Sequence, residues 1–516
     1  MSESCGNPNV ESEAVMPRKA KFDKGKTCVK CKENPGNLVI RHAVYCKDCF
    51  GPLISSRFRH ALEPHINATP SGPRRVALKP TGDLLVGFSG GLGSTVLLDL
   101  VHHSYLLKVV ANVSKGGKAH PRNNERVWKN VRACYVEIAD AFPGMKDRIE
   151  DVRAAVGRYD GVEFVPVRIQ DAFDPTWWEK VSGKPAPPLG LDIDLSDEDV
   201  RISSSNSDST PISALHSYLR KLPTPTAVHS TISTLIRILL LYTAHATTSS
   251  HLVQGTSLTS LSINLISSIS QGGGFVVPQV TQEEWFPRTS PAPTESATAR
   301  RSVRVIRPLR DIGMKECAAW AWWNQLPIAG KQKVPVSRQT IDDLTKDFIV
   351  GLEKDFPSTV STIAKTVAKL APKGDAGDRC VMCELPTQRS AQEWKARIAI
   401  RSFTAPDPST TLSPATSLSP LLCYSCHTTL TSRSSRGAIP AQTGMPVAGP
   451  PSPLVPLPAW TVAHLAAPAD TLEPHGCSPS DSTREGEQHG EVWEAKKLSV
   501  DDLRTLVGDF MLDDDS

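Results

Sequence analysis

A strand, a glycine-rich turn and a helix follow one another between residues 84 and 98, and this segment constrains the fold more than any other part of the chain. The turn reads Ser89-Gly90-Gly91-Leu92-Gly93-Ser94. Such a join points backbone N–H groups and the positive end of a helix at one spot, which makes a site for an anion, most often a phosphate. The Gly-Lys-[Ser/Thr] of a Walker loop is absent, and so is the third glycine of a dinucleotide fingerprint. We predict a phosphate loop of another kind, with a purely structural turn as the alternative.

Strand-like and helix-like segments alternate around this turn. Strands are expected at 83–88, 133–138, 162–168, 251–254 and 303–306, and helices at 94–103, 145–157, 257–270 and 313–324. Alternation of this kind indicates a parallel sheet with helices on both faces. The sequence therefore predicts a Rossmann-like α/β fold, flanked by Cys-rich modules and interrupted by disordered inserts.

The composition separates segments that are expected to fold from segments that are expected to be disordered. With 42 prolines and 6% aromatic residues among 516, several Ser/Thr/Pro tracts cannot bury enough apolar surface to fold. We expect a disordered start (1–16), a Cys-rich module (17–60), a linker (61–80), the α/β domain (81–330), a helical segment with a second Cys-rich module (331–430), a low-complexity linker (431–491) and a terminal helix with an acidic tail (492–516). Surface loops or disordered excursions are expected at 183–211, 286–298 and 404–420.

The charge pattern permits nucleic-acid binding without requiring it. The formal net charge is +4, and the stretch 18–32 is crowded with Lys and Arg. A contact to RNA phosphates and a solvated arm both account for that stretch. No apolar signal segment follows Met1, and the longest apolar run, at 235–242, is shorter than the ~20 residues of a membrane span. We expect a soluble, cytoplasmic protein.

Eight of the twelve cysteines form four C-x-x-C pairs. The pairs Cys28/Cys31 and Cys46/Cys49 have the spacing of two knuckles joined by a hairpin, which predicts a closed four-cysteine zinc site that stabilises the fold. Redox chemistry or unpaired thiols are the alternatives.

The second set of pairs is more widely spaced. It consists of Cys380/Cys383 and Cys423/Cys426, separated by an insert. We predict one shared zinc here too, with two independent turn-stabilising pairs as the alternative. His427 could replace a ligand, but we expect it to be exposed.

The turn at 89–94 follows the S-G-G-x-x-S outline of the PP-loop ATP pyrophosphatases. Taken in order with the cysteine pairs and with the segment 305–311, Val-Ile-Arg-Pro-Leu-Arg-Asp, it makes the chain resemble the cytoplasmic tRNA 2-thiolation protein 2 family. The resemblance implies a heterodimer with a paralogous PP-loop subunit. That complex is expected to adenylate the wobble uridine of Lys, Glu and Gln tRNAs, to take sulfur from a thiocarboxylated ubiquitin-like carrier, and to have a link to protein urmylation.

This chain departs from the pattern of the active paralogues in three places. Gly93 replaces the loop Asp, and Thr259 and Ser260 replace two carboxylates. Residues 230–234, Ser-Thr-Ile-Ser-Thr, stand where active members carry a sulfur-handling C-x-x-C pair. A hydroxyl cannot replace a thiolate as a sulfur carrier at neutral pH. We therefore predict no catalytic residue in this chain, and ATP binding at the loop is doubtful.

Two further groups are candidate contacts. Arg307 and Arg310 end a strand where ligands of open α/β sheets gather, so they are predicted RNA contacts, with surface ion pairing as the alternative. Trp320, Trp322 and Trp323 fit packing in the core or at a subunit interface better than stacking on RNA bases. The main hypothesis is a tRNA-binding, partner-supporting thiolation subunit. A self-sufficient ATP-dependent tRNA-modifying enzyme and a zinc-based protein scaffold are the alternatives.

Overall fold

The computed structural model describes most of the chain. The described residues are 27–41, 43–66, 82–107, 127–187, 190–196, 199–205, 209–281, 283–288, 301–330, 335, 339–367, 376–388, 417–432 and 454–466. The chain divides into two compact units, Met1–Ala467 and Pro468–Ser516, and all described residues lie in the first. The predictions for 1–16, for most of 286–298 and 404–420, and for 492–516 fall outside the described residues.

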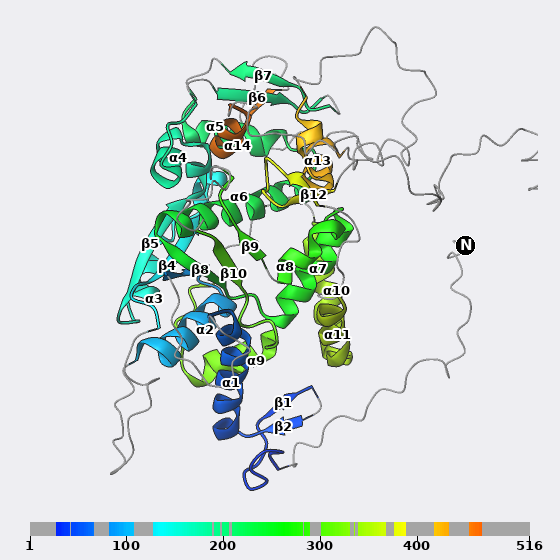
Figure 1. Cartoon of the computed structure of the whole chain (residues 1–516). Coiled ribbons are helices and arrows are strands. Elements are labelled where there is room, and N and C mark those ends of the chain that lie inside the picture. Colours follow the sequence, from blue (N-terminus) through cyan, green and yellow to red (C-terminus); the bar gives the residue numbers. More distant parts are fainter. Residues whose placement is uncertain are drawn as a thin grey trace, which may run out of the picture. The chain divides into compact units, whose positions relative to one another are not determined.

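A six-stranded sheet lies at the centre of the first unit, in the order β5-β4-β3-β8-β10-β9 (Figure 1). Its strands are β3 (Asp83–Gly87), β4 (Val131–Glu137), β5 (Val162–Arg168), β8 (Ser249–Gln254), β9 (Glu283–Trp285) and β10 (Val303–Ile306). Strand β9 pairs antiparallel with β10 at one edge, and the other strands are parallel. Leu84, Leu85 and Val86 are fully buried, as expected for a central parallel strand covered on both faces. The predicted α/β fold is confirmed.

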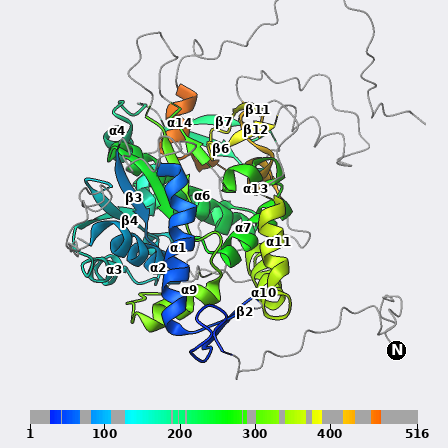
Figure 2. The same ribbon diagram turned by 60° about the horizontal axis from the view of Figure 1, so that its bottom comes forward.

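Alternate residues of β3 face two separate cores. Leu84 and Val86 pack with residues of α1 (Lys47–Ile66), α2 (Leu92–Val101), α3 (Ile149–Val156) and α9 (Met314–Trp323). Leu85 belongs to the other core, which contains residues of α4 (Pro175–Ser182), α5 (Pro211–Lys221) and α6 (Pro225–Ala246). The helices of both cores except α5 are labelled in Figure 2. A π-helical turn (His102–Leu106) continues α2, and 3-10 turns lie at Ala139–Ala141, Ile169–Phe173, Gly274–Val276 and Ser419–Leu421.

The strand order reverses next to β3. From β3 the chain proceeds to β4 and β5 on one side, and then to β8 and β10 on the other. In open α/β sheets, ligands bind at the carboxyl ends of the strands at such a switch point. The turns that follow β3 and β8 therefore mark the expected ligand crevice.

Helix α6 is the one helix in the described part of the chain that is long and apolar enough to cross a membrane. It has 22 residues, more than the predicted apolar run, but 61% of its most apolar window is buried inside the protein. Leu239 and Leu241 are fully buried, so this helix forms part of the core.

Smaller units pack around the main sheet. The hairpin β1 (Leu38–Ile40) and β2 (Ala43–Tyr45) precedes α1. A third core joins α7 (Leu258–Ser270), α10 (Ile341–Asp355) and α11 (Pro357–Val367), with α8 (Val277–Thr281) beside it. The second Cys-rich region holds β11 (Ala376–Arg379), β12 (Pro386–Gln388) and α13 (Tyr424–Thr431).

The structure corrects three expectations about loops and linkers. Residues 183–211 contain β6 (Gly190–Asp194) and β7 (Ile202–Ser205), which are not a surface loop but pair with β13 (Leu454–Pro456) in a three-stranded sheet. Strand β13 and α14 (Ala459–Ala466) lie in the segment expected to be a linker, and Trp460 is fully buried there. Helix α1 extends to Ile66, past the expected end of its module at 60.

Candidate metal centres and phosphate loop

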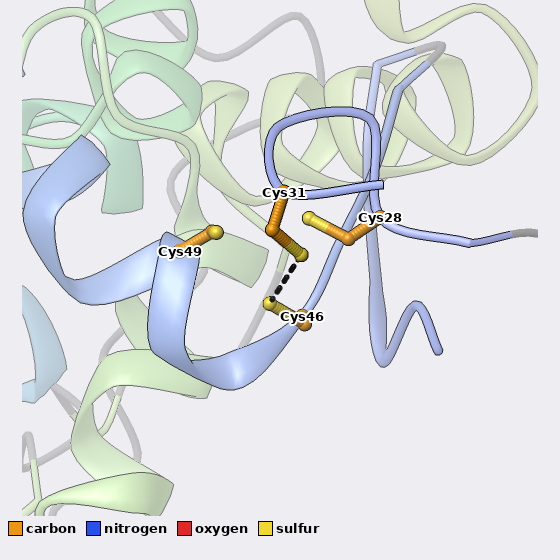
Figure 3. Close-up of side chains that lie close together, drawn as sticks. All are labelled: Cys28, Cys31, Cys46 and Cys49. Atoms are coloured by element: carbon orange, nitrogen blue, oxygen red, sulfur yellow. Dashed lines mark hydrogen bonds between the residues drawn. The ribbon is translucent and has the colours of Figure 1, made fainter. Parts of the chain in front are cut away.

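The first two cysteine pairs converge on one point. Cys28 and Cys31 lie in the loop before the hairpin, Cys46 follows β2, and Cys49 is in the first turn of α1. The four sulfurs lie within 4.8 Å of one another, with Cys31 Sγ and Cys46 Sγ 3.8 Å apart (Figure 3). The predicted hairpin therefore brings both knuckles together.

These distances fit a single tetrahedral ion. Four thiolates at about 2.3 Å from one ion place neighbouring sulfurs about 3.8 Å apart. A four-iron cluster would bind each thiolate to a different iron and hold the sulfurs further apart. Burial opposes ionisation of the Cys28 thiol, but hydrogen bonds from the backbone of Cys31 and Cys46 outweigh it and lower its pKa to about 6. Cys28 can thus supply a thiolate at neutral pH, whereas burial and the neighbouring thiols raise the pKa of Cys49 to about 12.

The second set of cysteines forms an equivalent cluster. Cys380 and Cys383 lie at the turn between β11 and β12, and Cys423 caps α13 and accepts a hydrogen bond from the N–H of Cys426. The four sulfurs again lie within 4.8 Å, and Cys383 Sγ and Cys423 Sγ are 3.7 Å apart. All four can bind one ion, as predicted. His427 is 1% exposed, so the expectation that it would be exposed is wrong.

A buried carboxylate stands beside the second cluster. Glu384 follows Cys383 in the chain and accepts hydrogen bonds from Tyr242 Oη and Trp285 Nε1, both at 2.6 Å. Arg379 lies 3.2 Å from it and His464 Nε2 lies 3.5 Å away. Burial lowers the pKa of His464 to about 4, so its ring is neutral at pH 7. This network joins α6, β9 and α14 to the cluster, and no local sequence pattern predicts it.

The predicted phosphate loop lies at the carboxyl end of β3, as expected. Gly90 has a φ of +72°, which favours glycine, and Gly91 caps α2 without a side-chain hydrogen bond. The two serines are engaged within the loop: Ser94 donates to the carbonyl of Gly91 at 3.0 Å, and its Oγ lies 3.2 Å from that of Ser89. The loop thus keeps the backbone form of an anion site. Binding of an anion by these residues stays a prediction.

The predicted RNA contacts differ in exposure. Arg310 is 38% exposed and forms an ion pair at 3.8 Å with Asp311. The Nη1 atom of Arg307 is buried. Arg310 is therefore the better placed of the two to reach a phosphate.

The tryptophans of α9 separate into two groups. Trp320 is buried and donates a hydrogen bond to Asp99 at 2.8 Å, and Trp323 packs edge-on against Phe50. Trp322 is 81% exposed. The first two form part of the core, whereas Trp322 remains available to a partner or to RNA.

Comparisons with known proteins agree with the resemblance seen in the sequence. A family profile described as cytoplasmic tRNA 2-thiolation protein 2 matches residues 340–428. The protein of that name from Xenopus tropicalis is 26% identical over 411 residues, which cover 72% of this chain and 75% of the relative. The proteins of that name from Pyrenophora tritici-repentis (strain Pt-1C-BFP) and from Homo sapiens are also 26% identical, over 72% and 74% of this chain and 87% and 75% of their own length. The resemblance to this family is confirmed.

Solved structures are similar as well, and one of them shows the extent of the likeness. It is the U34-tRNA thiolase NcsA from Methanococcus maripaludis with its 4Fe-4S cluster, at a TM-score of 0.43 and 16% identity. The match covers 69% of this chain and 93% of that chain.

Proposed function

We propose that this chain is a cytoplasmic, non-catalytic subunit of a heterodimeric complex that thiolates the wobble uridine of Lys, Glu and Gln tRNAs. In this proposal it binds tRNA and supports a paralogous PP-loop subunit, which performs the adenylation and sulfur transfer. The partner receives sulfur from a thiocarboxylated ubiquitin-like carrier.

The similarity to proteins named cytoplasmic tRNA 2-thiolation protein 2, over about three quarters of the chain, is the main support for this proposal. The residues of the crevice favour the non-catalytic role. Gly93, Thr259 and Ser260 offer no carboxylate to hold Mg²⁺ on a triphosphate. Ser230 offers a hydroxyl where sulfur transfer needs a thiolate.

Zinc is the proposed metal of both cysteine clusters. Each brings four cysteine sulfurs within 4.8 Å of one another, and a site with four cysteine ligands leaves no open position at which water could be activated. Their proposed role is to hold the hairpin on α1 and to join α13 to the turn between β11 and β12. When bound, zinc would contribute folding free energy and no catalytic step.

Deleting the gene tests the proposal. The deletion strain is expected to lose 2-thiouridine from the wobble position of Lys, Glu and Gln tRNAs, seen as lost retardation on a mercury-containing gel. Expression of the wild-type chain should restore retardation, and a tRNA that is not thiolated serves as the loading control. Normal thiolation in the deletion strain would refute the proposal.

Purification separates a supporting subunit from a self-sufficient enzyme. The tagged chain is expected to co-purify with a PP-loop protein and tRNA, both identified by mass spectrometry. The isolated chain should show negligible tRNA-stimulated ATP turnover, whereas robust turnover would favour the self-sufficient enzyme.

A further inference from the structure

We infer that residues of this chain itself fill the crevice between β3 and β8. The phosphate loop then connects and packs the turns of the sheet and does not form a nucleotide pocket. Three contacts fill the crevice. The first is a backbone contact between Gly93 and Gly255, and the second is made by the carboxylate of Glu353 in α10 at the first turns of α7 and α9. In the third, the segment that follows α9 is hydrogen-bonded to Gly90. The inference deepens the proposed function, because it leaves the nucleotide to the partner, but its test does not depend on thiolation.

The first contact joins the two turns at the switch point. Gly93 is in the first turn of α2 and Gly255 follows β8. A Cβ on Gly93 would lie 2.1 Å from the carbonyl oxygen of Gly255, and a Cβ on Gly255 would lie 2.5 Å from the backbone of Gly93 and Ser94. Both distances are far below any normal contact, so this approach requires glycine at both positions. An Asp at position 93 has no room while the turns are in contact.

The second contact fills the space beside that joint. Glu353, near the end of α10, accepts hydrogen bonds from Thr259 Oγ1 at 2.8 and 2.9 Å. The same hydroxyl accepts the N–H of Met314 at 3.0 Å, and the Leu258 N–H bonds to the carbonyl of Ile312. The positive ends of α7 and α9 therefore face a carboxylate of the chain itself. A carboxylate at position 259 would repel Glu353, so a hydroxyl there permits the contact.

The third contact covers the phosphate loop. The N–H of Gly330 donates to the carbonyl of Gly90 at 3.0 Å, and a Cβ on Gly90 would lie 3.3 Å from the Cβ of Ala329. Arg148 donates to the carbonyls of both Ala329 and Gly330. These bonds hold the segment that follows α9 across the loop.

A buried carboxylate positions Arg148. Glu137, at the end of β4, is fully buried and accepts the N–H groups of Ile138, Ala139 and Arg148 at 2.7 to 2.8 Å. The turn that carries Arg148 is thus fixed to the sheet. The contact between Gly330 and Gly90 is therefore connected, through Arg148, to the end of β4.

Titration of the full-length chain with MgATP tests closure directly. The expected result is no saturable binding and no rise in melting temperature up to millimolar MgATP, because a ligand that binds only the folded state must stabilise it. Saturable binding that is weakened by Arg148→Ala or Ser94→Ala would overturn the inference. That outcome would not affect the proposed function if tRNA thiolation still required the chain. If instead MgATP did not bind and the deletion strain thiolated its tRNA normally, only the proposed function would be refuted.

Hydrogen exchange tests the contact made by Glu353. Thr259→Val and Glu353→Ala should each speed amide exchange at the first turns of α7 and α9 and in the last turns of α10 by about tenfold to a hundredfold, the effect of losing a hydrogen bond to a charged group. Glu353→Gln keeps an acceptor and should show a smaller effect. Lys354→Ala, an exposed neighbour on α10, is the matched control. Unchanged exchange in both Thr259→Val and Glu353→Ala would overturn the inference.

Discussion

Replacing Gly93 by alanine tests whether the two turns at the switch point are in direct contact. The added Cβ would be 2.1 Å from the carbonyl oxygen of Gly255, and Cβ atoms essentially never approach closer than 3.0 Å. Either α2 or the turn after β8 must therefore move by about 1 Å. Because the backbone fixes the position of a Cβ and the carbonyl oxygen is itself a backbone atom, no side-chain rotation relieves the clash.

That displacement is expected to lower the free energy of unfolding. Overpacking a well-ordered interior costs about 1–3 kcal/mol, and a clash between backbone segments belongs at the upper end of that range. Without the clash, alanine would stabilise a helical position by about 0.5–1 kcal/mol relative to glycine. Gly351, inside α10, has open space around it and provides that comparison.

Urea unfolding of the full-length chain, followed by intrinsic tryptophan fluorescence, measures the two variants. Gly93→Ala is expected to unfold at lower urea concentration than the wild type, and Gly351→Ala at equal or higher concentration. Gly255→Ala should resemble Gly93→Ala, and the double variant should cost less than the sum, since both changes disrupt one contact. If Gly93→Ala and Gly351→Ala shifted the midpoint equally, there would be no direct contact at Gly93.

Three further predictions concern the metal, pH and α9. Full-length protein should contain two zinc ions by elemental analysis, and Cys28→Ser or Cys380→Ser should each remove one; iron in their place would contradict the assignment. Burial lowers the pKa of His251 to about 4, so the unfolded chain binds a proton that the folded chain does not between about pH 6.5 and 4. His251 should therefore contribute a fall in stability of up to about 3 kcal/mol as the pH drops through that window, so that the loss is smaller by about that amount in His251→Gln, as measured by urea unfolding at each pH. Trp320→Ala should cost about 3–5 kcal/mol by the same assay, whereas the exposed Trp322→Ala should change stability by less than about 0.5 kcal/mol; equal costs would contradict their different burial.

The parallel sheet could be predicted because its signals are local. The strands Val162–Arg168 and Val303–Ile306 have the predicted bounds, and β3 reads as a continuous apolar run before a glycine turn. Burial on both faces requires such runs in parallel strands, so the pattern appears in the sequence itself. The spacing of two residues between paired cysteines is also local, because it places both thiolates on one turn.

Contacts between distant segments could not be predicted in this way. In strand β6, Leu191 and Ile193 alternate with aspartates, but so short an alternation is a weak signal for a strand. The burial of Ile193 depends on pairing with Val455 in β13. Ile193 and Val455 are both fully buried, although each lies in a tract whose composition indicates disorder. Composition averages over a tract, whereas a strand of three residues needs only one partner to become ordered.

The three departures from the active pattern are best explained together by the structure. Gly93 allows the close approach of Gly255, Thr259 binds Glu353, and Ser230 donates a hydrogen bond to Gln271. Each of these three residues thus has a packing or hydrogen-bonding role of its own. Restoring an Asp at position 93 would therefore disrupt a contact before it could supply a metal ligand. The proposed non-catalytic role of the chain and the inferred closure of the crevice would then result from the same change in the fold.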